Sequence, residues 1–153
     1  MRLALYQPDI PQNVGAAIRV AACFDAGLDI IGPAGFPLSS KALRRAAMDY
    51  GELATPAIHD SWTQFQASLG DQRLVLLTTT ADQSIWDFEF SEADVILMGR
   101  ESAGAPDAVH QTAHARLSIP LAKAARSLNV HVAAAVTLAE ARRQLTSVAT
   151  AAR

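Results

Sequence analysis

The chain has 153 residues with 13 Lys+Arg and 15 Asp+Glu, which give a formal net charge of -2. Half of the residues are hydrophobic and 18% are charged, so the chain can bury a core and is not an intrinsically disordered segment. Its single cysteine, Cys23, excludes an internal disulfide and a multi-cysteine metal site. The charge balance also argues against a strongly basic nucleic-acid-binding module.

The sequence contains no apolar run near the roughly 18 residues that a membrane helix requires. The first apolar stretch ends at Gln7, which is too early for the hydrophobic region of a signal peptide. We therefore expect a cytoplasmic protein that is not associated with a membrane.

Short apolar runs bounded by turn residues alternate with helical patterns along the chain. The runs predict strands at Arg2–Tyr6, Leu28–Gly32, Arg73–Thr79, Asp94–Met98 and Arg116–Ile119. Helices are predicted at Asn13–Ala26, Ser40–Tyr50, Ser61–Leu69 and Asn129–Leu145. Because the strands are almost continuously hydrophobic, they are typical of a parallel sheet covered on both faces. The alternation predicts one doubly wound α/β domain over residues 1–153.

Ligands in such folds bind in the loops that follow the strands. The first of these loops leads into a helix for which Asn13 is the expected N-cap, with Gly27 closing its far end. Arg19 follows six residues after Asn13 among apolar neighbours. Two interpretations stay open for Arg19: a solvated arginine on an amphipathic helix, or a guanidinium that binds a phosphate or carboxylate bidentately.

A second loop begins with Gly99 and reaches Gly104 five residues later. Ala105 and Pro106 follow where a phosphate-binding P-loop requires Lys and Ser or Thr, so that motif is excluded, and the dinucleotide pattern GxGxxG is absent. The loop is either an ordinary connection or a place where the backbone approaches a ligand beside Glu101.

The last loop, Pro120–Leu128, carries Lys123 and Arg126 ahead of the longest predicted helix. Ser127 or Asn129 could simply cap that helix. The same residues, beside a basic loop, would also suit an anionic or polar ligand.

In this order the segments YQPDIPQN, GRESAGAP and SIP…RSLN resemble the three signature motifs of the SPOUT superfamily of RNA methyltransferases. The resemblance is strongest to its small single-domain branch, the tRNA (cytidine(34)-2'-O)-methyltransferases, and it extends from Leu5 to Leu145. The blocks KALRR, from Lys41 to Arg45, and LTT, from Leu77 to Thr79, are also similar.

This resemblance implies methyl transfer from S-adenosylmethionine to a ribose 2'-hydroxyl of tRNA, without a metal, at the wobble cytidine or uridine 34. It further implies a C-terminal trefoil knot and a homodimer in which the first and last helices pack together. The positions that match the family's reaction centre are Asn13, Arg19, Glu101, Ser127 and Asn129. Those that match its cofactor pocket are Leu77, Gly99, Ile119, Ser127 and Leu128. The cluster Lys41, Arg44 and Arg45 is either a solvated helix face or a tRNA-binding patch.

Family proposals give the role of general base to the residue that matches Arg19. A guanidinium is effectively never deprotonated in a protein. We therefore expect Arg19 to clamp the adjacent phosphate and stabilise the developing alkoxide, with a phosphate oxygen as the proton acceptor.

The chain departs from the branch at two positions: His131 stands where a serine is usual, and Ala139 where a tyrosine is common. His131 could pack within the helix or contact RNA or a partner subunit. His110 and His114 are spaced for one helix face, but no third metal ligand is evident. Cys23 is expected in the core.

Two other functions remain open: a 2'-O-methyltransferase acting elsewhere on tRNA or on ribosomal RNA, and a noncatalytic nucleotide-binding module. The charges, however, are unevenly distributed. Residues 82–107 contain seven acids and one base, whereas residues 108–153 contain six bases and one acid. The low net charge therefore excludes a strongly basic binder but does not exclude RNA.

Overall fold

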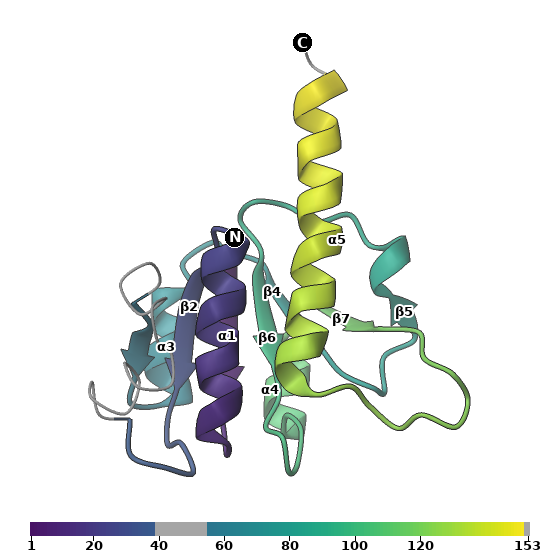
Figure 1. Ribbon diagram of the computed structural model, residues 1–153. Helices are drawn as coiled ribbons and strands as arrows, with labels where there is room; N and C mark the ends of the chain where they lie inside the picture. Colours follow the sequence, from purple (N-terminus) through teal and green to yellow (C-terminus); the bar gives the residue numbers. More distant parts are fainter. Residues whose placement is uncertain (39–54, 152–153) are drawn as a thin grey trace.

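The computed structural model describes residues 1–38 and 55–151, and the strands in these ranges form one seven-stranded sheet (Figure 1). The strands are β1 (Arg2–Tyr6), β2 (Gly27–Ile31), β3 (Ala57–His59), β4 (Leu74–Leu77), β5 (Gln83–Ser84), β6 (Val95–Met98) and β7 (Ala115–Ser118). Their order across the sheet is β3-β2-β1-β6-β4-β7-β5, and every pairing is parallel. The segments that follow the strands therefore emerge at the same edge of the sheet.

Helices cover both faces of this sheet. They are α1 (Pro11–Cys23), α3 (Trp62–Ser68), α4 (Asp107–Thr112) and α5 (Val130–Ala151), with a short 3-10 helix η2 (Ile85–Asp87). The helices α1 and α5 pack side by side on one face, as Figure 1 shows. The helices α3 and α4 cover the other face, where they contribute Phe65 and Val109 to a second buried cluster. The parallel sheet flanked by helices confirms the predicted α/β class.

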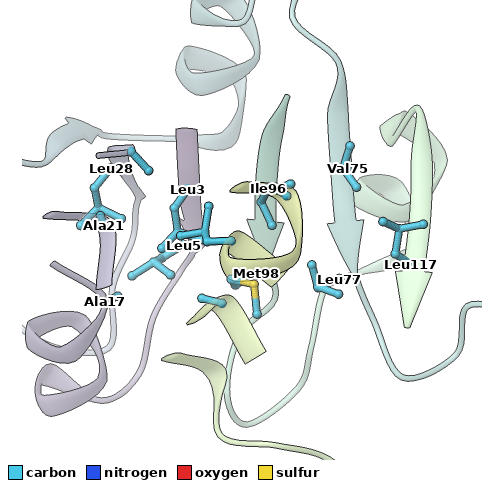
Figure 2. Close-up of a cluster of buried hydrophobic side chains, with 14 of the residues drawn as sticks. Leu3, Leu5, Ala17, Ala21, Leu28, Val75, Leu77, Ile96, Met98 and Leu117 are labelled. Carbon is cyan, nitrogen blue, oxygen red and sulfur yellow. The ribbon is translucent and has the colours of Figure 1, made fainter. Parts of the chain in front are cut away.

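Successive strand residues alternate between the two cores, as the period of a β-strand requires. In β1, Leu3 and Leu5 face α1 and α5, whereas Ala4 belongs to the cluster beneath α3 and α4. Figure 2 shows the larger core, in which side chains from α1 and from five strands meet. Its labelled members are Leu3, Leu5, Ala17, Ala21, Leu28, Val75, Leu77, Ile96, Met98 and Leu117.

Small side chains occupy the core in which α1 meets α5. Ala17 and Ala21 of α1 and Ala134 and Ala141 of α5 are fully buried there. Arg142 adds a polar connection, because its Nε donates to the carbonyl oxygen of Phe24 just after α1 at 2.8 Å. The high alanine content thus lets the two helices lie close together on one face of the sheet.

Two buried aspartates are held by arginines. Asp29, on β2, accepts hydrogen bonds from Nε and Nη2 of Arg2 at 2.8 and 2.5 Å. The Nε2 of His59 lies 2.7 Å from Oδ1 of Asp29. Asp94, just before β6, accepts Nε and Nη2 of Arg73 at 2.7 and 2.8 Å. Paired in this way, the buried carboxylates are not left as isolated charges, which would be strongly destabilising.

The five predicted strands and three of the four predicted helices are confirmed, with shifts of up to six residues at their ends. The fourth helix, Ser40–Tyr50, lies outside the described residues. Ser61 caps α3 as expected, since its side chain accepts the amide of Gln64. The elements β3, β5, η2 and α4 were not predicted because they are only two to six residues long.

Several local predictions about the first helix were wrong. The helix begins at Pro11 with Ile10 as its N-cap, so Asn13 lies inside it and is buried. Its far end is a turn with Asp25 at a φ of 50°, and Gly27 is the first residue of β2. Cys23 is exposed rather than part of the core, because it lies on the face of α1 that points away from the sheet.

Replacing Leu138 by alanine tests the packing of α5 on the sheet. Leu138 is fully buried, so Leu138→Ala should lower the free energy of unfolding by about 2–5 kcal/mol in a urea titration. The control Ile58→Ala, at a residue 42% exposed on the edge strand β3, should change it by less than about 1 kcal/mol. Equal losses in the two variants would contradict this packing.

Candidate active site

A cavity of about 660 Å³ opens at the edge of the sheet where the strands end. The loops after β4, β6 and β7 and the first residues of α5 supply most of its walls, and α1 contributes Asn13. The lining mixes the apolar side chains of Leu77, Met98, Ile119 and Leu128 with hydroxyl, amide and charged groups. Its volume is within the range of about 300–1,000 Å³ that is usual for small-molecule sites. The arrangement suits a ligand with both apolar and polar parts.

The loop after β6 is closed on itself by its own backbone. The amide of Arg100 donates to the carbonyl of Gly104 at 3.1 Å, and the amide of Gly104 donates back at 2.8 Å. A Cβ on Gly99 would lie 2.8 Å from the amide nitrogen of Ala105, closer than real contacts allow. Gly104 has a φ of 68°, where glycine is preferred. The two glycines thus permit a tight loop, a different structure from the P-loop excluded above.

The Glu101 carboxylate joins this loop to the segment that follows β1. Its Oε2 accepts the backbone amide of Asp9 at 2.7 Å, and its Oε1 accepts Asn13 Nδ2 at 3.0 Å. A hydrogen-bond chain continues from there to α5, because Asn129 Nδ2 donates to Asn13 Oδ1 at 3.4 Å. Glu101 therefore connects three segments that lie far apart in the sequence.

The groups at the two ends of this series of hydrogen bonds fix the orientation of the side-chain amides of Asn13 and Asn129. A carboxylate only accepts, so Asn13 must direct its NH₂ group toward Glu101 and its oxygen toward Asn129. At the other end the amide of His131 only donates, and it reaches Asn129 Oδ1 at 3.2 Å. Asn129 is thereby confirmed as the cap of α5, and its NH₂ group faces Asn13.

A second carboxylate, that of Asp9, binds the loop after β6 but does not itself line the cavity. Its Oδ1 accepts Nε of Arg100 at 2.7 Å, and its Oδ2 accepts the hydroxyl of Ser102 at 2.5 Å and the amide of Ser102 at 3.2 Å. The Arg100 guanidinium, followed by the Ser102 hydroxyl, lowers the pKa of this carboxyl from 3.8 to about 2. Asp9 is therefore ionised at any pH near neutrality.

Most residues singled out from the sequence come together around this one cavity. The lining includes all five of the expected cofactor residues: Leu77, Gly99, Ile119, Ser127 and Leu128. It also includes four of the five residues expected at the reaction centre: Asn13, Glu101, Ser127 and Asn129. Segments separated by more than 100 residues in the chain thus contribute to one site.

Arg19 is not among the residues that line the cavity. It is exposed on α1, and six residues of helix place it about 9 Å along the axis from Asn13. The expected RNA-binding residues Lys41, Arg44 and Arg45 lie outside the described residues.

Two residues of the site, Asp9 and Arg100, had not been assigned a role from the sequence. Asp9 follows β1 and Arg100 follows β6, and these strands are neighbours in the sheet. Their positions just beyond two apolar runs were visible in the sequence. What the sequence lacked was the order of the strands, which places the aspartate opposite the arginine.

Within residues 1–38 and 55–151, no group of three or more His, Cys, Asp or Glu side chains is arranged to hold a metal ion. His114, considered above as a metal ligand, instead accepts a hydrogen bond at Nδ1 from the amide of Leu74 at the start of β4, at 3.0 Å. The same described part of the chain includes no helix that is both long and apolar enough to cross a membrane.

The lowered pKa of Asp9 can be tested by following its carboxyl carbon by NMR during an acid titration. In the wild-type protein Asp9 should stay ionised as the pH falls through 3.8, and its contribution to stability should be lost only between about pH 4 and about pH 2. Arg100→Met should return the pKa toward 3.8, and Ser102→Ala should raise it by less. A wild-type midpoint near 3.8 would contradict this assignment.

Comparison with known proteins gives the site a context. The family model described as the SpoU rRNA Methylase family matches residues 1–139. The tRNA (cytidine(34)-2'-O)-methyltransferase of Beijerinckia indica subsp. indica is 53% identical over 149 residues, which cover 96% of this chain and 93% of that protein. The protein of the same name from Escherichia coli K12 is 34% identical over 147 residues, covering 95% and 94% of the two chains.

Solved structures agree with the sequence comparison. A structure described by the words "2-OH methylation of C/U34 on tRNA" has a TM-score of 0.90 and 40% identity, and the match covers 95% of this chain and 96% of that one. The SpoU methyltransferase AviRb from Streptomyces viridochromogenes, in complex with AdoMet, has a TM-score of 0.82 and 29% identity, with 96% and 61% covered. The sequence match over residues 1–139 and this likeness in fold together show that the chain belongs to the SpoU methylase family.

Proposed function

We propose that the protein transfers a methyl group from S-adenosylmethionine to the ribose 2'-hydroxyl of cytidine or uridine 34 in tRNA. The names of the relatives from Beijerinckia indica and Escherichia coli support this activity and this nucleotide. The observation that carries the proposal is the convergence of the cofactor and reaction-centre positions around one cavity. A noncatalytic nucleotide-binding module would not require Glu101 and two oriented amides at the rim of that cavity.

The cavity fits S-adenosylmethionine in size and in chemistry. Leu77, Ile119 and Leu128 offer apolar contacts, and Gly99, whose missing Cβ lets the loop after β6 fold tightly on itself, adds backbone to the wall. We assign these three side chains, with Gly99 and Ser127, to hold the cofactor. When bound there, S-adenosylmethionine supplies an activated methyl group carried on a sulfonium centre, and the transfer leaves S-adenosylhomocysteine.

The residues at the rim position the ribose and its proton. The 2'-oxygen forms a bond to the methyl carbon as the carbon–sulfur bond breaks, and the hydroxyl proton passes to an oxygen of the adjacent phosphate. Arg19, exposed on α1, lies outside the cavity of its own chain, so in the proposed homodimer we assign it to the site of the partner subunit. There it clamps that phosphate and stabilises the developing alkoxide. Asn13 and Asn129 each have a second amide hydrogen that can donate to the ribose.

Several further features belong to the proposal. The family resemblance supports one domain over residues 1–153 with a trefoil knot in its C-terminal part. It also supports a cytoplasmic homodimer in which α1 and α5 contribute the contact. Val132, on α5, is 39% exposed and offers apolar surface for that contact. Lys41, Arg44 and Arg45 are assigned to bind tRNA.

Gly99→Ala tests the cofactor cavity. A Cβ at this position would lie 2.8 Å from a backbone nitrogen, so the loop after β6 must shift into the cavity or out of its turn. Calorimetry should show S-adenosylmethionine binding weakened by at least about tenfold. The control Gly70→Ala adds a methyl group at a glycine of positive φ with nothing within 4 Å of the added carbon, so it should bind like the wild type. Equal binding by all three proteins would remove Gly99 from the site.

Methylation of tRNA transcripts with labelled S-adenosylmethionine, followed by nucleoside mapping, tests the activity itself. The wild type should produce 2'-O-methylcytidine or 2'-O-methyluridine at position 34. Arg19→Lys keeps the charge but loses the bidentate fork, so its rate should fall by roughly 10- to 100-fold. Full activity of Arg19→Lys would exclude the phosphate clamp. Methylation at another position, or of ribosomal RNA, would overturn the assigned nucleotide, and the absence of methylation on any RNA would overturn the reaction.

A further inference from the structure

Asp9 lies where three loops of the sheet edge meet. Its carboxylate binds Arg100 and Ser102 of the loop after β6, and both Nε and Nη2 of Arg100 lie 2.7 Å from its Oδ1. We call Asp9, Arg100 and Ser102 the Asp9 clasp. The clasp connects the segment that follows β1 to the segment that follows β6, which is 91 residues further along the chain.

The loop after β2 packs against the same aspartate. A Cβ on Gly35 would lie 3.1 Å from both the Cα and the Oδ1 of Asp9. The absence of a side chain at Gly35 therefore lets its backbone pack closely against Asp9. The amide of Gly35 also donates to the carbonyl of Pro8 at 2.9 Å. Displacement of Asp9 would therefore disturb the loop after β2 at Gly35.

The clasp acts directly on the reaction centre through the backbone. The amide of Asp9 donates to Oε2 of Glu101, whose other oxygen orients Asn13. Arg100 and Ser102 are the neighbours of Glu101 in the chain, so both sides of the Glu101 contact are held by the clasp. If the clasp opens, Glu101 is no longer held in place. It then no longer fixes the orientation of the Asn13 amide, which in turn contacts Asn129.

We propose that Asp9 and Arg100 are positioning residues for methyl transfer: their ion pair fixes Glu101 and Asn13 relative to the ribose without contacting it. This inference rests on the proposed function of the same site. The ion pair directs Nε and Nη2 of Arg100 toward Asp9, so this part of the guanidinium is committed to the clasp. A displacement of about 1 Å at a reacting group can reduce a rate by about 100-fold, so opening the clasp should lower the rate. Arg100 also lines the cavity, whereas Asp9 does not, so a change at Asp9 separates the rate from cofactor affinity.

A double-mutant cycle with Asp9→Asn, Arg100→Met and their combination tests the inference. Each single variant should lower kcat by roughly 10- to 100-fold, and in Asp9→Asn, at a residue outside the cavity lining, the KM for S-adenosylmethionine should change by less than about threefold. The double variant should be no slower than the slower single variant, because both remove the same contact. Arg100→Lys, which keeps one charged donor for Asp9, should recover part of the rate.

Arg73→Met is the matched control, since it breaks another Arg–Asp pair, in which Nε and Nη2 of Arg73 hold the two oxygens of Asp94 just before β6. It should lower the urea midpoint but leave kcat near the wild-type value. Retention of kcat by Arg100→Met, or losses in the two single variants that multiply in the double variant, would overturn the inference. If Arg100→Met raised only the KM for tRNA and left kcat unchanged, the inference would also be overturned, and Arg100 would be an RNA contact.

A second measurement does not depend on activity. The side-chain amide protons of Asn13 should show slow solvent exchange by NMR in the wild type and in Arg73→Met, because Asn13 donates to Glu101 and is buried. Exchange should accelerate in Asp9→Asn and Arg100→Met. Unchanged exchange in both variants would overturn the positioning role even if the wild type methylates tRNA. Accelerated exchange in a protein that methylates no RNA would overturn the proposed function and leave the clasp as a structural link.

Discussion

The position of β6 between β1 and β4 is the constraint on which the rest of the structure depends. Because all three strands are parallel, the loops after them leave the sheet side by side. Glu101, just beyond β6, therefore reaches Asp9 and Asn13 beyond β1, while Gly99 lines the same cavity as Leu77 at the end of β4. A different place for β6 in the sheet would separate the cofactor positions from the carboxylate that organises the reaction centre.

The two buried cores hold the helices against the sheet, whereas the polar site orients the functional groups. Alanines at the contact of α1 with α5 let two helices share one face of the sheet, and Arg2 and Arg73 neutralise the aspartates buried within the sheet or just before it. The site is built differently, from carboxylates and amides whose hydrogen bonds allow one orientation. Such a network is rigid before any ligand binds, so the oriented groups need little reorganisation during the reaction.

Short-range patterns predicted elements well where burial alone decides the conformation. Parallel strands are buried on both faces, so their apolar runs are continuous and were recognised. The three-residue β3 and the two-residue β5 were missed because so few residues carry no periodicity. Asn13 was mistaken for a helix cap because an asparagine after a loop satisfies the local rule. Its side-chain amide instead donates a hydrogen bond to Glu101, 88 residues away. Rules based on neighbouring residues cannot predict such a distant partner.

The sequence by itself determined the α/β class and the family, and its motifs predicted eight of the residues that line the cavity, because turn glycines, apolar runs and motif spacing are local properties of the chain. Only the tertiary structure decided that Cys23 is exposed, that Arg19 lies outside the cavity of its own chain, and that Asp9 pairs with Arg100. The physical reason is the same in each case. The direction of a side chain follows from the packing of its helix or strand against others, and the partner of a charge follows from strand order rather than from distance along the chain.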